Sequence, residues 1–198
     1  MPASKFDELL AKGIRQGKIP ARTSSARRWY RGQAEKVTTS PRNLMTREAD
    51  RLVNKQGIGN MYAFFYDPKT KAKLPYYDTF PLVFPIKKLP DGFLGINMHY
   101  LPYQFRARLM DALYTITNNK NYDETTKLRI SYDILNAASK FKFFKPTIKR
   151  YLSEKVKSRF LYINPTEWDI AIFLPVERFQ KASKETVWNE SRKSIGGR

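Results

Sequence analysis

Residues 59–100 contain three short apolar runs separated by turn sequences, which leaves no room for a long helix in this part of the chain. The first run, 60–66, is rich in aromatic residues, as strands often are. Asp67-Pro68 and Pro90-Asp91-Gly92 separate the runs with residues typical of tight turns. Short connections join antiparallel neighbours. We therefore expect a small, strongly curved antiparallel sheet or an SH3-like barrel over residues 59–100.

Two segments of this predicted sheet are distinctive: one is a strand interrupted by prolines, and the other is a later strand that we expect to join the same sheet. The second apolar run, 80–86, contains Pro81 and Pro85. Proline has no N–H to donate to a neighbouring strand, so we expect this run to be an edge strand or a bulged strand. Residues 159–163 form another short apolar run, and we expect them to rejoin the sheet.

Helical patterns dominate the chain after residue 102. Apolar residues recur every three or four positions, as on one face of a helix. Asn164-Pro165-Thr166-Glu167 combines an N-cap residue, a proline at the first helical position and an acidic third residue. The sequence predicts helices over 103–117, 124–138 and 148–156, a short one after 164, and a last one over 183–193. The fold class is therefore α+β, with helices covering the sheet.

The first 56 residues lack a continuous apolar stripe. Residues 6–14 have a weak helical pattern, and Ser40-Pro41 is a good start for a short helix that we expect to end by Lys55. We interpret 1–56 as a basic N-terminal arm, helical or extended, whose arginines and tyrosines lie outside the core. Residues 57–182 then form the globular domain, and residues 183–198 form a C-terminal helix and a frayed tail.

The charge of the chain is strongly positive and unevenly distributed. It has 37 Lys and Arg against 18 Asp and Glu, a formal net charge of +19. Residues 1–56 hold 13 basic and 5 acidic side chains, and residues 120–163 hold 11 and 4. Such an excess repels itself in a compact state unless a polyanion lies nearby. Nucleic acid, an acidic membrane surface and an acidic protein are the candidate partners.

Basic and aromatic residues alternate in both charged blocks, as they do in many nucleic-acid interfaces. On a helix, Lys142, Lys145 and Lys149 would share one face. The alternative is a solvated basic face over ordinary core aromatics, which we favour for the aromatics but not for the charges. The candidate DNA-binding residues are Arg22, Arg27, Arg28, Arg31, Lys140, Lys142, Lys145, Lys149, Arg150, Lys155, Lys157 and Arg159.

Residue types needed for catalysis are scarce. The chain has no cysteine and a single histidine, His99, which excludes disulfides, thiolate zinc sites and multi-histidine metal sites. Asp67-Pro68-Lys69 has the acidic-x-lysine form of a magnesium nuclease, but no acidic partner precedes it on a strand, and Asp67 is explained as a turn residue. We expect no enzyme activity, no metal and no cofactor.

No apolar run approaches the ~20 residues that span a bilayer. The first residues, MPASKFDE, lack the apolar core of a signal peptide. We expect a soluble protein without a membrane partner.

The central region resembles small structural proteins of T4-like tailed phages, closest to the DNA end protector family. The motifs are GNMYAFFYDPKTK at 59–71, LPYYDTFPLV at 74–83 and DGFLGINMHYLP at 91–102. The likeness extends from about residue 24 to about residue 192. It implies a non-enzymatic virion protein that binds the ends of packaged linear DNA and shields them from host exonuclease. It also implies other head–neck or tail proteins as neighbours, several copies per particle, and a place in the virion and, during assembly, in the host cytoplasm.

Two alternatives remain open at the level of sequence. The chain would also suit a purely structural head–neck, tail or baseplate component whose charge serves an acidic protein neighbour or the DNA channel. An endonuclease that trims DNA ends is the weaker alternative, for the reasons given for Asp67.

Overall fold

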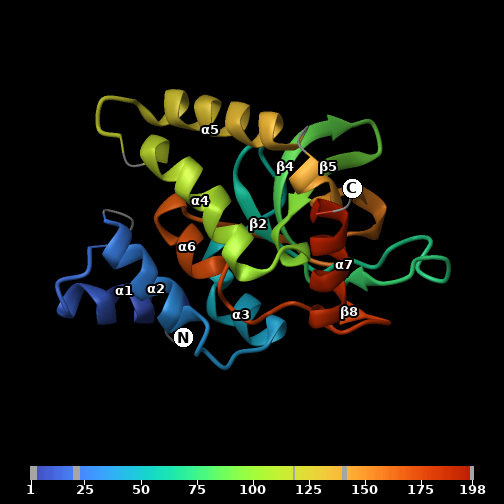
Figure 1. Ribbon diagram of the computed structural model, residues 1–198, viewed down its shortest axis with the longest axis horizontal. Coiled ribbons are helices and arrows are strands. Elements are labelled where there is room, and N and C mark those ends of the chain that lie inside the picture. Colours follow the sequence, from blue (N-terminus) through green and yellow to red (C-terminus); the bar gives the residue numbers. More distant parts are fainter. Residues whose placement is uncertain (1–3, 20–22, 118, 140–141, 197–198) are drawn as a thin grey trace.

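The computed structural model describes residues 4–19, 23–117, 119–139 and 142–196. Six strands form one antiparallel sheet in the order β1-β7-β2-β4-β5-β6, and β3 pairs with β8 in a separate two-stranded sheet (Figure 1). The strands are β1 (Leu52–Val53), β2 (Met61–Ala63), β3 (Tyr77–Asp78), β4 (Leu82–Leu89), β5 (Gly92–Asn97), β6 (Ile148–Leu152), β7 (Phe160–Ile163) and β8 (Phe179–Gln180). The α+β class is confirmed. The SH3-like barrel is wrong, because edge strands β1 and β6 do not pair across the described residues.

Strand β4 lies in the middle of the sheet, between β2 and β5, although it contains Pro85. The expectation of an edge strand is wrong, and the expectation of a bulge is confirmed by the register shift between Pro85 and Lys87. The carbonyl of a proline can still accept a hydrogen bond, and here the N–H of Gly59 donates to the Pro85 carbonyl at 2.9 Å. The bulge thus accommodates the missing N–H without ending the strand.

Residues 148–156 do not form the predicted helix. Ile148–Leu152 is strand β6 and pairs with β5, with Lys149 opposite Gly95 and Tyr151 opposite Phe93. Apolar spacing over a short segment is ambiguous between helix and strand, and pairing with the free edge of β5 decides it here. Residues 159–163 do rejoin the sheet, since Phe160–Ile163 is β7.

Seven α-helices lie in the described part of the chain: α1 (Lys5–Arg15), α2 (Ser24–Ala34), α3 (Pro41–Arg47), α4 (Tyr103–Thr117), α5 (Glu124–Ser139), α6 (Trp168–Ala171) and α7 (Lys184–Gly196). Short 3₁₀ turns include η2 (Met98–Tyr100), η3 (Lys142–Thr147) and η5 (Pro165–Glu167). The predicted helix starts are confirmed: Ser40 Oγ accepts from the Asn43 N–H, and Asn164 and Glu167 form a capping box. Helix α3 ends at Arg47, before the expected limit of Lys55, because Leu52–Val53 joins the sheet as β1.

Alternate residues of the strands divide the core into two parts. One face of the sheet, with Phe84, Ile96 and Leu161, packs into the main core together with the helices. The other face carries a cluster of mostly aromatic side chains. Its members are Tyr62, Phe64, Tyr66, Val83, Phe93, Tyr151 and Phe160. We call this second side of the sheet the aromatic face, and it positions the site described below.

The N-terminal helices pack onto the main core, and Figure 1 shows α1 and α2 at the lower left of the molecule and α3 at the bottom centre. Phe6 of α1 and Tyr30 of α2 are buried in that core. The expectation that the arginines and tyrosines of 21–56 lie outside the core is therefore wrong for Tyr30, and also for Arg27 and Arg31, which are 4% and 8% exposed. The reason is close packing between helices: a Cβ at Gly13 would lie 2.1 Å from Tyr30 Oη. The division into 1–56, 57–182 and 183–198 stays a prediction.

Candidate nucleic-acid interface

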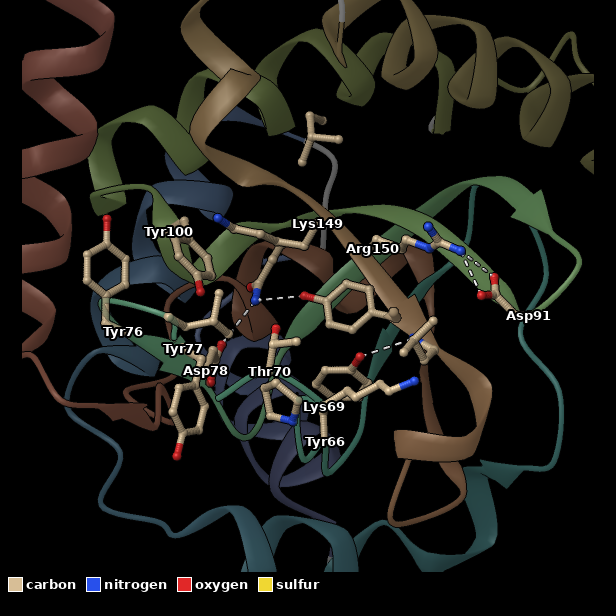
Figure 2. A pocket seen from close by; sticks show the side chains of 16 residues that line it. Tyr66, Lys69, Thr70, Tyr76, Tyr77, Asp78, Asp91, Tyr100, Lys149 and Arg150 are labelled. Carbon is tan, nitrogen blue, oxygen red and sulfur yellow. Dashed lines mark hydrogen bonds and ion pairs between the residues drawn. The ribbon is translucent and has the colours of Figure 1, made fainter. Parts of the chain in front are cut away.

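A pocket of about 500 Å³ opens on the aromatic face, between strands β5 and β6 and the segment 66–78 (Figure 2). That volume lies within the range of small-ligand sites. The pocket is lined by five tyrosines, Tyr66, Tyr76, Tyr77, Tyr100 and Tyr151, and by three basic residues, Lys69, Lys149 and Arg150. Tyrosine rings offer stacking surfaces and the basic groups attract anions, so the lining suits a nucleotide.

Lys149 projects from β6 next to the ring of Tyr100, as Figure 2 shows. Its Nζ lies 4.0 Å from the ring centroid, a favourable distance for a cation–π contact. Burial lowers the pKa of Lys149 to about 8, because water no longer solvates the ammonium fully. No carboxylate forms an ion pair with Lys149 in the described part of the chain. The pocket therefore contains a cation that the described acids leave without an anionic partner.

The carboxylate of Asp78 lies at the bottom of the pocket, fully engaged in hydrogen bonds. Asp78 Oδ2 is 2.8 Å from His99 Nδ1 and accepts from Asn97 Nδ2, while the Phe80 N–H donates to Oδ1. Burial raises the pKa of Asp78, but the attraction of His99 and these hydrogen bonds outweigh it and hold that pKa below its usual value. An ionised carboxylate only accepts, so His99 Nδ1 is the donor. His99 thus orients the Asp78 carboxylate.

The network continues from Asp78 into the pocket wall. Asn97 Nδ2 also donates to Tyr151 Oη, at 3.1 Å. On the opposite side, Tyr66 Oη accepts from the Leu152 N–H at 3.0 Å. These bonds fix both tyrosines in place, and burial raises the pKa of each, so both stay neutral at physiological pH. Both rings are buried, at 8% and 3% exposed, and form a fixed wall of the pocket.

Basic side chains gather on the rim. Arg150 forms an exposed ion pair with Asp91 at 2.6 Å, visible at the right of Figure 2. The loop of residues 67–75, which we call the rim loop, carries the exposed Lys69, Lys71 and Lys73. Lys71 pairs with Asp67 at 2.8 Å. Lys181 Nζ holds this loop by donating to the carbonyls of Lys71, Ala72 and Leu74.

The structure brings part of the predicted second block to this pocket. Lys149 and Arg150 line it directly. Lys155 and Lys157 follow β6 and join the base of the rim loop, where the Asp67 N–H donates to the Lys155 carbonyl and the Lys157 N–H donates to the Phe65 carbonyl. Arg159 is exposed just before β7.

The expected common helix face of Lys142, Lys145 and Lys149 does not exist, because Lys145 lies on η3 and Lys149 on β6. Lys145 is exposed. Arg22, Lys140 and the side chain of Lys142 lie outside the described residues.

The first block lies elsewhere, at a second pocket of about 410 Å³ lined by Arg27, Arg28, Arg31, Asp111 and others. Arg27 and Arg31 bridge α2 to α4 and α6: both pair with Asp111 and with Asp169. Their charges are therefore already balanced. Arg28 is exposed on the same helix.

The pocket tyrosines and Lys69 were not among the predicted site residues. The sequence did show an aromatic run at 60–66 and a turn after it, but aromatic residues in such a run belong to a core more often than to a site. Only the pairing of β5 with β6 and the path of the rim loop bring Tyr66, Tyr77 and Tyr100 around one cavity.

Two observations bear on other kinds of site. No group of three or more histidine, cysteine or acidic side chains that could hold a metal ion occurs among residues 4–19, 23–117, 119–139 and 142–196. None of the described helices is both long enough and apolar enough to cross a membrane.

The comparisons with known proteins point to one family. A family model described as phage T4 terminal DNA protecting protein matches residues 6–192, which is nearly the whole chain. Neither the curated proteins nor the solved structures gave a match. The resemblance noted at 59–102 is thus confirmed and extends over the N-terminal helices.

Proposed function

The chain belongs to the family of phage T4 terminal DNA protecting proteins, and on that premise we propose that it binds the ends of packaged linear DNA and shields them from host exonuclease, without catalysis of its own. The observation that carries the proposal is the match over residues 6–192. The net charge of +19 supports it, because phosphate neutralisation drives binding to DNA whatever its sequence.

The site geometry supports the same proposal. A DNA end differs from the interior of a duplex in two respects: the face of its last base is open for stacking, and its terminal phosphate, where present, is a monoester. The pocket on the aromatic face offers tyrosine rings together with the cation of Lys149. The lysines of the rim loop and Lys155, Lys157 and Arg159 would contact the backbone of the adjoining duplex. Such contacts position the protein without selecting a sequence.

We place the protein in the virion, and in the host cytoplasm during assembly, with other head–neck or tail proteins as neighbours and several copies per particle. A purely structural role among those neighbours is the competing function.

The test is a digestion time course of linear duplex DNA by a double-strand exonuclease, with and without the protein. Binding to a linear hairpin duplex, which has one end, is compared with binding to a closed dumbbell of the same sequence, which has none. We expect protection of the linear DNA and tighter binding to the hairpin. Equal binding to both, with no protection, would leave a structural protein that binds polyanions and would remove the end-binding proposal.

A further inference from the structure

The pocket on the aromatic face contains features that backbone binding does not need. Contacts to a duplex backbone are made by exposed cations, of which the rim loop already supplies three. Lys149 is instead half-buried, with its ammonium over the ring of Tyr100, where its charge costs free energy. A half-buried cation without a carboxylate partner is a candidate for binding an anion from outside.

We propose that this pocket takes the terminal nucleotide of the DNA end, with Lys149 binding its terminal phosphate monoester and the tyrosines of the wall stacking on its base. The proposal rests on the proposed function and deepens it, because it names the part of the DNA that distinguishes an end. The phosphate sits at the 5′ or the 3′ terminus, and the experiment below separates the two.

Charge favours a terminal phosphate over an internal one. A phosphate monoester carries about −1.5 to −2 charges at pH 7, whereas each internal phosphodiester carries a single charge. The carboxylate at the bottom of the pocket, Asp78, is held by His99 and Asn97. Asp91, on the rim, is held by Arg150. Neither acid pairs with Lys149, so its ammonium is available to the more highly charged phosphate.

Size and chemistry favour a single nucleotide. The cavity of about 500 Å³ suits one nucleotide rather than a length of duplex. Aromatic stacking contributes about 1 to 3 kcal/mol per base and tolerates every base. Tyr76 and Tyr77 are half-buried and offer ring surface to a base, whereas the buried Tyr66 and Tyr100 form other walls of the cavity (Figure 2). Unpairing costs least at a terminus or in a single-stranded overhang, so an unpaired terminal nucleotide enters most easily.

The experiment measures affinities of the full chain for hairpin duplexes that differ only at their single end. The ends carry a 5′-phosphate, a 3′-phosphate or hydroxyls alone, each blunt or with a short overhang, and a closed dumbbell serves as the DNA without an end. We expect one of the two phosphorylated ends to bind about tenfold more tightly than the hydroxyl end, as one charge-assisted hydrogen bond allows. The preference should be larger with the overhang.

Lys149→Met should reduce that ratio to about one, and Lys149→Arg should retain most of it. Methionine keeps the apolar bulk of the side chain, so the variant should fold. The matched control is Lys87→Met, which removes an exposed lysine of β4 outside the pocket. It should weaken binding to every DNA equally and leave the ratio unchanged.

A ratio near one in the unaltered protein, or an unchanged ratio in Lys149→Met, would overturn the inference. If end protection persists in that case, the proposed function stands without this pocket. If the dumbbell binds as tightly as every hairpin and no end is protected, the proposed function itself fails.

Discussion

Arg106 and the half-buried Lys149 differ in what surrounds them. Arg106 is fully buried, and its guanidinium donates to the carboxylate of Glu177 at 2.7 Å and to the carbonyls of Leu101 and Ile172. Lys149 faces a tyrosine ring and the open pocket instead. A buried charge that is paired and hydrogen-bonded is part of the scaffold, whereas a buried charge that lacks an anion is a candidate for ligand binding.

This difference leads to a stability prediction for Lys149→Met. Since burial lowers the pKa of Lys149 to about 8, the protonated lysine costs free energy in the folded chain at pH 7. We expect the variant to raise the free energy of unfolding at pH 7 by about 1 to 3 kcal/mol. Between pH 8 and about 10.4 the unfolded chain binds the proton and the folded chain does not, so the unaltered protein gains stability as pH rises. The advantage of Lys149→Met should therefore shrink over this range.

The measurement is urea unfolding of both proteins at pH 7 and pH 9.5. Other ionisable groups around the pocket are present in both proteins and cancel in the difference. They are Tyr66, Lys69, Tyr76, Tyr77, Asp78, Asp91, Tyr100, Arg150 and Tyr151. Lys88→Met, at an exposed position of β4, should change stability by less than about 0.5 kcal/mol at either pH. A variant that is less stable than the unaltered protein at pH 7 would contradict the prediction.

At the scale of elements, the rim loop is held by hydrogen bonds from one lysine, Lys181, which directly follows β8. Lys181 Nζ donates to three carbonyls of residues 71–74 at 2.6 to 3.1 Å. Lys181 itself has a φ of 68°, in the left-handed region. Without the ammonium, those carbonyls would accept hydrogen bonds from water instead. The rim loop, which forms one wall of the pocket, would then open more often.

We expect Lys181→Met to raise amide hydrogen exchange in the rim loop by about fivefold to tenfold, because hydrogen bonds to a charged group are worth about 1.5 to 3 kcal/mol when buried and less at an exposed site. Methionine has the same backbone preference as lysine here, so the ammonium alone is tested. The control is Lys184→Met, which changes a lysine over the Trp188 ring in α7. Unchanged exchange at residues 69–75 would show that the loop is held by other interactions.

At the scale of the whole molecule, the question is which side of the basic surface meets DNA. Lys155 and Lys157 join the base of the rim loop, and Arg159 is exposed two residues further along the chain. The helical hairpin α4–α5 carries the exposed Arg108, Lys120 and Arg129. Both sets contribute equally to the net charge. The first set includes the two lysines that join the rim loop of the proposed end-binding pocket.

The dependence of affinity on salt distinguishes the two sides. Neutralising about six phosphates would give a slope of about −5 for log affinity against log salt on duplex DNA. Replacing Lys155, Lys157 and Arg159 with alanine should make that slope shallower by about 3, at about 0.9 for each phosphate that is no longer neutralised. The triple alanine variant of Arg108, Lys120 and Arg129 should leave it nearly unchanged. Equal changes in both variants would show that DNA binds diffusely over the surface.

Local patterns in the sequence determined several features of this protein. The helix starts at Ser40 and Asn164 and the bulge at Pro85 follow from residues within a few positions of one another. Backbone hydrogen bonding and allowed dihedral angles act over that short range, so they can be inferred from the sequence. The excess of positive charge is likewise a property of composition alone.

Only the tertiary structure decided which charges are paired and which aromatic rings are buried. Arg31 and Lys149 have similar sequence surroundings, but Arg31 meets Asp169 of α6, 138 residues away, and Lys149 meets the ring of Tyr100. Residues 148–152 form a strand because β5 offers them an open edge. Burial and pairing depend on groups brought together from distant parts of the chain, and local spacing contains no information about which distant groups these are.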